Sequence, residues 1–144
     1  MNNTPNFVVL SSSVEYKKYY VMKYCKSEIK TFDGMKVIFH EDRFEHAFYE
    51  SSDKVHGNKD IFSVERAKRI DWIEYVLKNP EAQLYVGWDK RRKTYDNSRR
   101  VAIITPDDYV VIIMITGKKK AKFITAYYAD NSANKIRTAP IWKE

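Results

Sequence analysis

Cationic and aromatic side chains gather in one short segment, from Gly87 to Arg100. The segment carries six cations against two anions, Asp89 and Asp96, and its two rings are Trp88 and Tyr95. Because cations neutralise phosphates and flat rings stack on bases, this mixture favours binding of nucleic acid, single-stranded RNA in particular. A solvated basic hairpin between two strands is the alternative interpretation. The cations are Lys90, Arg91, Arg92, Lys93, Arg99 and Arg100.

Histidine is the side chain best suited to proton transfer near neutral pH, and the chain has three, His40, His46 and His56. Cutting RNA without a metal requires a base for the 2′-hydroxyl proton, an acid for the departing 5′-oxygen, and cations beside the phosphate. His46 is the first candidate, because it follows Arg43 by about one helical turn and that arginine can hold a phosphate beside it. His40 is the second candidate, with a capping or packing role as the alternative. We expect His56 at the surface.

The last predicted strand adds two hydroxyl groups. Side chains alternate along a strand, so Phe123, Thr125 and Tyr127 are expected on one face and Ile124 and Ala126 on the other. The small apolar pair suits contact with helices, which leaves the first three on the open face. There a base would stack on Phe123, Thr125 would bind a phosphate oxygen, and Tyr127 would donate a proton or a hydrogen bond. Ordinary strand residues of high β-propensity are the alternative interpretation.

Hydrophobic spacing predicts a helical half that must position these groups. We expect a short strand at Phe7–Leu10, followed by a helix over Val14–Ser27 with Tyr16, Tyr20 and Tyr24 on one stripe. A hairpin is predicted to pair Ile29–Phe32 with Met35–Phe39. Two further helices are expected, one from Glu41 to about Ser51 with Phe44, Ala47 and Phe48 buried, and one from the Ser63 cap to Asn79.

After Pro80 the spacing changes from helical to extended. Strands are predicted over Gln83–Trp88, Val101–Thr105, Tyr109–Thr116 and Ala121–Tyr128, and the short connections make the last three an antiparallel meander. The fold class is therefore α+β, with N-terminal helices packed on one face of a mainly antiparallel, about four-stranded C-terminal sheet.

Composition restricts the class of protein and the kinds of partner it can have. The chain has 144 residues, a net charge of +7 and 44% hydrophobic residues, which suits one folded domain with an anionic partner. Its single cysteine, Cys25, forms no intrachain disulfide, and we expect neither a metal nor a cofactor. The longest aliphatic run, Val110–Ile115, is too short to cross a bilayer, and the N-terminus lacks the pattern of a signal peptide. We expect a cytoplasmic monomer with no membrane partner.

Three segments resemble the barnase, EndoU, colicin and RelE group of ribonucleases, its phage and mobile-element members most of all. They are Arg43–Phe48, Ala67–Trp72 and Phe123–Tyr127, within a similarity that covers Met35 to Tyr128. The resemblance implies a ribonuclease-like domain over residues 35–144, with residues 1–34 as an N-terminal extension of the same structural unit. It also implies metal-independent RNA cleavage on the open face of the sheet, in a toxin or mobile-element effector whose partners include RNA and either the ribosome or an immunity protein.

The chain departs from part of that group. Barnase-like members place a histidine on a late strand and EndoU-like members use two, whereas this chain has none after His56. RelE-like members use arginine, lysine and tyrosine and need the ribosome, a mode that here would involve Arg91, Arg92, Arg100 and Tyr127. Three hypotheses therefore stay open: an endoribonuclease, free-acting or ribosome-dependent; an RNA-binding module without catalysis, in which Lys118–Lys122 grip phosphates; and a ribonuclease fold kept for protein contacts.

Overall fold

The computed structural model describes residues 4–51, 60–89 and 91–142. Six strands form one sheet in the order β1-β2-β8-β7-β6-β5, with all neighbours antiparallel except β2 and β8, which run parallel. The strands are β1 (Ile29–Lys30), β2 (Lys36–Ile38), β5 (Gln83–Asp89), β6 (Thr94–Ile104), β7 (Tyr109–Gly117) and β8 (Lys120–Tyr128). A separate two-stranded sheet pairs β3 (Tyr49–Glu50) with β4 (Ile61–Phe62).

The α+β class is observed, but the prediction of about four mainly antiparallel strands is wrong. The predicted N-terminal hairpin joins the sheet, because β2 pairs with β8 over Lys120–Lys122. β1 and β2 each bury a single apolar side chain, Ile29 and Val37. Strands this short give no periodic signal by which they could be assigned to the main sheet.

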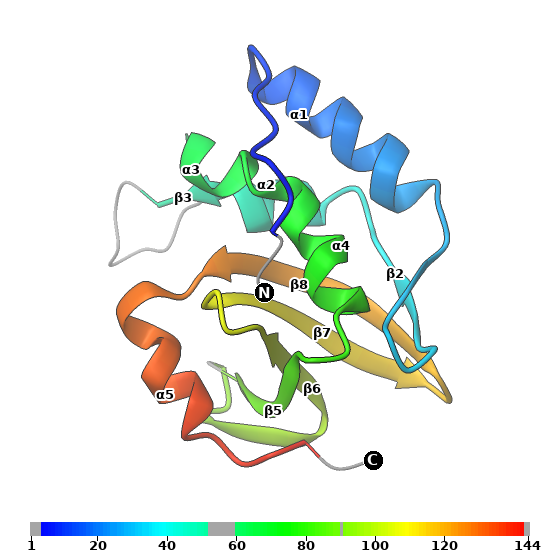
Figure 1. The fold of residues 1–144 in the computed structure, drawn as a ribbon, viewed down its shortest axis with the longest axis vertical. Coiled ribbons are helices and arrows are strands. Elements are labelled where there is room, and N and C mark those ends of the chain that lie inside the picture. Colours follow the sequence, from blue (N-terminus) through cyan, green and yellow to red (C-terminus); the bar gives the residue numbers. More distant parts are fainter. Residues whose placement is uncertain (1–3, 52–59, 90, 143–144) are drawn as a thin grey trace.

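The helices cover one face of this sheet (Figure 1). They are α1 (Ser13–Tyr20), the π-helical turn η1 (Val21–Cys25), α2 (Arg43–Phe48), α3 (Val64–Ala67) and α4 (Ile70–Lys78). The single helix predicted after Ser63 is two helices, because the backbone leaves helical geometry at Arg69. None of the helices in the described ranges has the length and apolarity needed to cross a membrane.

The predicted tyrosine stripe lies in the core. Tyr16, Tyr20 and Tyr24 are fully buried, and their hydroxyls donate to the backbone oxygens of Val8, His40 and Ile70 over 2.6–2.8 Å. Buried hydroxyls satisfied in this way stabilise the contact between α1 and the segments beneath it.

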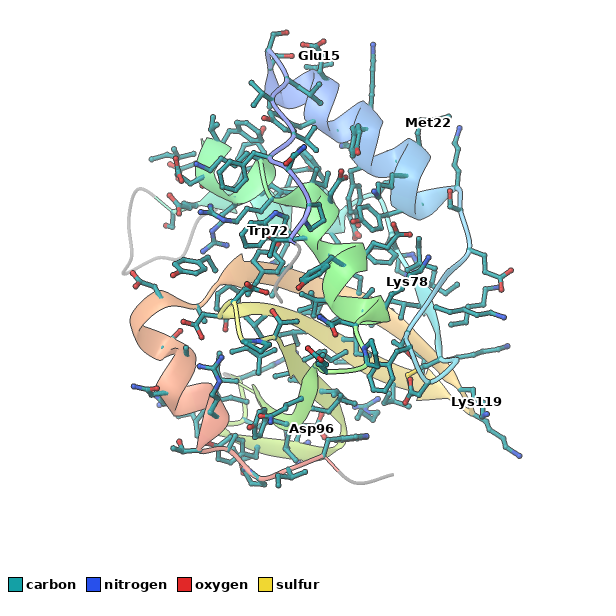
Figure 2. The ribbon with its side chains drawn as sticks, in the orientation of Figure 1. Glu15, Met22, Trp72, Lys78, Asp96 and Lys119 are labelled. Atoms are coloured by element: carbon teal, nitrogen blue, oxygen red, sulfur yellow. The ribbon has the colours of Figure 1, made fainter. Side chains whose placement is uncertain are left out.

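The N-terminal segment is not the strand predicted at Phe7–Leu10. Residues 4–10 lie as an extended coil across α4, where the indole of Trp72 donates to Pro5 O at 2.9 Å and Val8 N donates to Lys68 O at 2.8 Å. Trp72 lies between this coil and the sheet (Figure 2), with its ring edge-on to Tyr109 of β7 at 5.4 Å.

The other face of the sheet is covered only in part. The turn η2 (Asp130–Ser132) and α5 (Ala133–Arg137), for which no sequence pattern was found, pack small alanines against the outward side chains of β5, β6 and β7. Figure 1 shows α5 on the opposite side of the sheet from α4. The tail then pairs with β5, since Val86 N donates to Pro140 O and Trp142 N to Leu84 O. The rest of this face carries the candidate site.

Candidate functional site

A pocket of about 680 Å³ opens beside β8, on the face of the sheet that α4 does not cover. Its walls come from β5, β6, β7 and β8 and from the short helices α2 and α3. The lining residues are Arg43, His46, Arg66, Trp88, Arg91, Arg100, Ile112, Met114, Lys122, Ile124, Thr125 and Tyr127. All four residues predicted to be catalytic therefore lie around one pocket.

A β-bulge at Ile124 turns two of these residues into the pocket. Ile112 pairs with Thr125 but Ile113 pairs with Phe123, so Ile124 is an extra residue on β8. Phe123 before the bulge faces the helices and is 0% exposed, whereas Thr125 and Tyr127 after it line the pocket. The predicted stacking role of Phe123 and the predicted helix-facing position of Ile124 are both wrong, because strict alternation assumed a regular ladder.

Arg43 is held at this bulge. Its Nε donates to Ile124 O at 3.0 Å, at a part of the β8 edge beyond the three residues paired with β2. Burial lowers the pKa of the Arg43 guanidinium, and the nearby positive charge of Arg100 acts in the same direction while Asp42 opposes it. The hydrogen bond fixes one side of the guanidinium and leaves its other N–H donors available to an anion in the pocket.

His46 projects from the exposed side of α2 into the pocket lining. The predicted buried stripe of that helix, Phe44, Ala47 and Phe48, is confirmed, and it fixes which side of α2 His46 occupies. His40 does not line the pocket; its side chain is exposed and its carbonyl accepts the hydroxyl of Tyr20. His56 lies outside the described residues.

Arg66 is a lining residue that the sequence analysis missed. It lies in the first turn of α3, where the Ser63 side chain accepts from its backbone N–H. Its guanidinium donates to Ala47 O, pairs with Glu50 at 3.5 Å and lies 6.0 Å from the centre of the Tyr127 ring. These contacts join elements far apart in the chain, so no local pattern could have revealed them.

The phenol of Tyr127 stays protonated in the pocket lining. Burial raises its pKa, and the positive charge of Arg66 opposes that effect. Because the net direction is upward, the phenol is protonated at neutral pH and can donate a hydrogen bond toward the pocket, and the same shift makes it a weaker acid than an exposed tyrosine.

The basic segment from Gly87 to Arg100 is mostly strand, not loop. β5 continues to Asp89 and β6 begins at Thr94, and Trp88 pairs with Tyr95 with the two rings edge-on at 5.1 Å. Of the predicted RNA-binding residues in this segment, Trp88, Arg91 and Arg100 line the pocket. Arg92, Lys93, Tyr95 and Arg99 are exposed outside the lining, and Lys90 lies outside the described residues.

Arg100 enters the pocket because the β5–β6 register shifts between Val86 and Gly87. Its side chain crosses β5 at Gly87, where a Cβ atom would lie 2.5 Å from Arg100 Cγ. The Arg100 Nε is buried and has no hydrogen-bond partner among the described residues. This N–H group can therefore donate to a ligand in the pocket.

The pocket lining is strongly cationic. Four arginines and Lys122 line it, and no Asp or Glu is among the lining residues described. Like charges around a partly enclosed space attract a multiply charged anion. The predicted lysine run contributes only Lys122, because Lys118, Lys119 and Lys120 are exposed outside the pocket lining. Figure 2 shows Lys119 at the tip of the β7–β8 hairpin. Within the described ranges, no group of three or more His, Cys, Asp or Glu side chains is placed to hold a metal ion.

No protein-family model, no curated protein and no solved structure matches this chain. The ribonuclease resemblance therefore stays a prediction, and a function rests on the chemistry of the pocket.

Proposed function

We propose that the pocket binds RNA and cleaves its backbone by attack of a 2′-hydroxyl on the adjacent phosphorus. The observation that supports this function is that His46, Thr125 and Tyr127 share one pocket with four arginines and a lysine. Proton-transfer groups and phosphate-neutralising groups are the two requirements of this reaction.

Each group has a role in the proposed reaction. His46 accepts the proton of the 2′-hydroxyl as that oxygen bonds to phosphorus, and Tyr127 donates its proton to the 5′-oxygen as the old bond breaks. Arg43, Arg100 and Lys122 stabilise the extra negative charge on the phosphate oxygens, with Thr125 as a neutral donor. The products are a 2′,3′-cyclic phosphate and a free 5′-hydroxyl.

RNA binding without cleavage is the second candidate, because the cationic lining alone supports phosphate binding. A ribosome-dependent reaction and a role as a toxin or mobile-element effector follow from the resemblance only and stay predictions. An RNA substrate makes the cytoplasm the expected place of action.

The test is incubation of the purified protein with total RNA in EDTA, with and without ribosomes. Exposed histidines on either side of the start of α2 provide a matched pair of variants, His46→Gln and His40→Gln. Loss of a general base lowers the cleavage rate by roughly 10²- to 10⁴-fold, so we expect this loss for His46→Gln and near wild-type cleavage for His40→Gln. The fragments should carry cyclic phosphate ends.

Intact RNA with the wild-type protein in both conditions would contradict the proposal. If that protein still shifts RNA in a gel, the binding function is correct instead. Equal loss in both histidine variants would remove His46 from its proposed role.

A further inference from the structure

The pocket has an apolar floor between its cationic walls. Ile112 and Met114 of β7 lie beside Ile124, the bulged residue of β8, and all three line the pocket. A pocket for phosphate alone needs no apolar floor, since phosphates bind cations and N–H groups. The occupant that matches this lining therefore has a flat apolar body next to its negative charge, as a nucleotide does.

Trp88 provides a flat surface at the edge of this floor. Its ring is 48% exposed, and the edge-on contact with Tyr95 restricts its orientation. A base that stacks on an exposed indole ring gains affinity whatever its identity, because every base has a π-face. The floor and Trp88 together would hold one base.

The cationic groups around the pocket can donate to acceptor atoms of that base, such as O6 and N7 of guanine, but they cannot accept from its amino groups. Guanidinium and ammonium groups donate hydrogen bonds and accept none, and no carboxylate or carboxamide is among the described lining residues. Recognition of guanine or cytosine amino groups by a side chain uses such acceptors. The hydroxyls of Thr125 and Tyr127 are directed to the phosphate in the reaction proposed above.

We infer that the substrate is an unpaired RNA nucleotide whose base lies on the Ile112–Met114–Ile124 floor against Trp88, where stacking holds it. A paired base cannot reach this floor without leaving its helix, so duplex RNA is excluded. The cleavage part of this inference rests on the proposed function, whereas the binding part does not.

Cleavage specificity is tested with RNA hairpins that share one stem and differ only in the central nucleotide of the loop. We expect cuts in the loop and none in the stem, with purines cut faster than pyrimidines, because larger bases stack more strongly. Cleavage of the stem as fast as the loop, or faster cleavage at pyrimidines than at purines, would overturn the inference.

Binding is tested separately with the same hairpins carrying 2′-deoxynucleotides in the loop, which cannot attack the phosphate. Trp88→Leu should weaken binding roughly ten-fold, and Trp88→Phe, which keeps a flat ring, should recover most of it. Tyr128→Leu is the matched control, since Tyr128 is 46% exposed and lies outside the pocket lining.

The outcomes separate the two proposals. If Trp88→Leu binds the loop as well as the wild type, the inference fails while RNA cleavage can still stand. If the wild-type protein binds loops through Trp88 but cuts no RNA, the proposed function fails and the unpaired-base site stands.

Discussion

Arg43 and Arg100 show how single residues prepare the pocket for an anion. Burial lowers the pKa of Arg43, the positive charge of Arg100 acts in the same direction, and the Arg100 Nε has no hydrogen-bond partner among the described residues. Two guanidinium groups that repel each other raise the free energy of the empty pocket. A phosphate bound between them removes that repulsion, so its binding is favoured by more than a single ion pair would give.

Removing the charge of Arg100 should therefore change the salt dependence of RNA binding. For Arg100→Gln we expect weaker binding and a slope of log affinity against log salt that is smaller by about 0.7, the value for one contact to single-stranded nucleic acid. Lys135→Gln on the exposed side of α5 loses the same charge outside the pocket and should leave the slope unchanged. Equal slopes for Arg100→Gln and the wild type would place Arg100 outside the RNA contact.

Gly87 makes room for the Arg100 side chain. A methyl group at this position would lie 2.5 Å from Arg100 Cγ, so Gly87→Ala should destabilise the protein by about 1–3 kcal/mol, the usual cost of overpacking. Arg100→Ala removes the Cγ and Cδ atoms but keeps Cβ at 3.2 Å, so the cost of Gly87→Ala should fall in that background. Urea denaturation of the four proteins of this double-mutant cycle measures the difference, and additive costs would contradict the contact.

The β7–β8 hairpin contains a backbone conformation that suits glycine better than lysine. Lys119 has a φ of 55°, whereas its neighbour Lys118 has no positive φ. Lys119→Gly should raise the free energy of unfolding by about 0.5–1 kcal/mol, because the left-handed conformation costs an L-residue about 1–2 kcal/mol and the added flexibility of glycine offsets part of the gain. Lys118→Gly removes the same charge from the same turn.

Urea denaturation compares the two variants directly. We expect Lys118→Gly to be slightly less stable than the wild type, because it adds flexibility without relieving strain. Equal effects of both substitutions would show that charge, not backbone conformation, determines stability in this turn.

Helices and strands with regularly spaced apolar residues were predictable from the sequence, and irregular elements were not. β7, β8 and the C-terminal end of α4 lie within one or two residues of their predicted positions, because long apolar patterns reflect burial directly. The break at Arg69 and the bulge at Ile124 depend on tertiary contacts, which local propensity does not contain. α5 is only five residues long, so it has no apolar stripe to detect.

The candidate site was predictable in the same uneven way. Residue chemistry identified His46, and strand alternation identified Thr125 and Tyr127, and these three residues do share a pocket. Strand alternation misplaced Phe123, and Arg66 had no signal because its partners Ala47 and Tyr127 are distant in sequence. Spatial grouping of residues from separate elements is information that a single sequence carries only weakly.

Buried tyrosines make the stability of the whole molecule sensitive to alkali. Burial raises the pKa of Tyr20, Tyr24 and Tyr109 well above the ordinary value of about 10. Below pH 10 these phenols are protonated in both the folded and the unfolded protein, so they make no contribution to the pH dependence of stability. Above pH 10 the unfolded chain loses protons that the folded protein keeps, so stability falls as pH rises.

The expected loss is about 1.4 kcal/mol per pH unit for each of these tyrosines above pH 10. Urea denaturation at pH 8, 9, 10 and 11 measures it. The variant Tyr109→Phe, whose hydroxyl has no partner among the described residues, should lose stability less steeply. An unchanged slope in Tyr109→Phe would contradict the burial of that phenol.

The parallel pairing of β2 with β8 has a consequence for synthesis. Arg43 follows β2 closely, whereas the carbonyl that it binds belongs to Ile124 of β8. A nascent chain emerging from a ribosome therefore has no pocket until translation has passed Tyr127, and no shorter N-terminal fragment contains one. A protein that cleaves RNA would in this way stay harmless to its own message and to the ribosome that makes it until almost all of the chain described here has been produced.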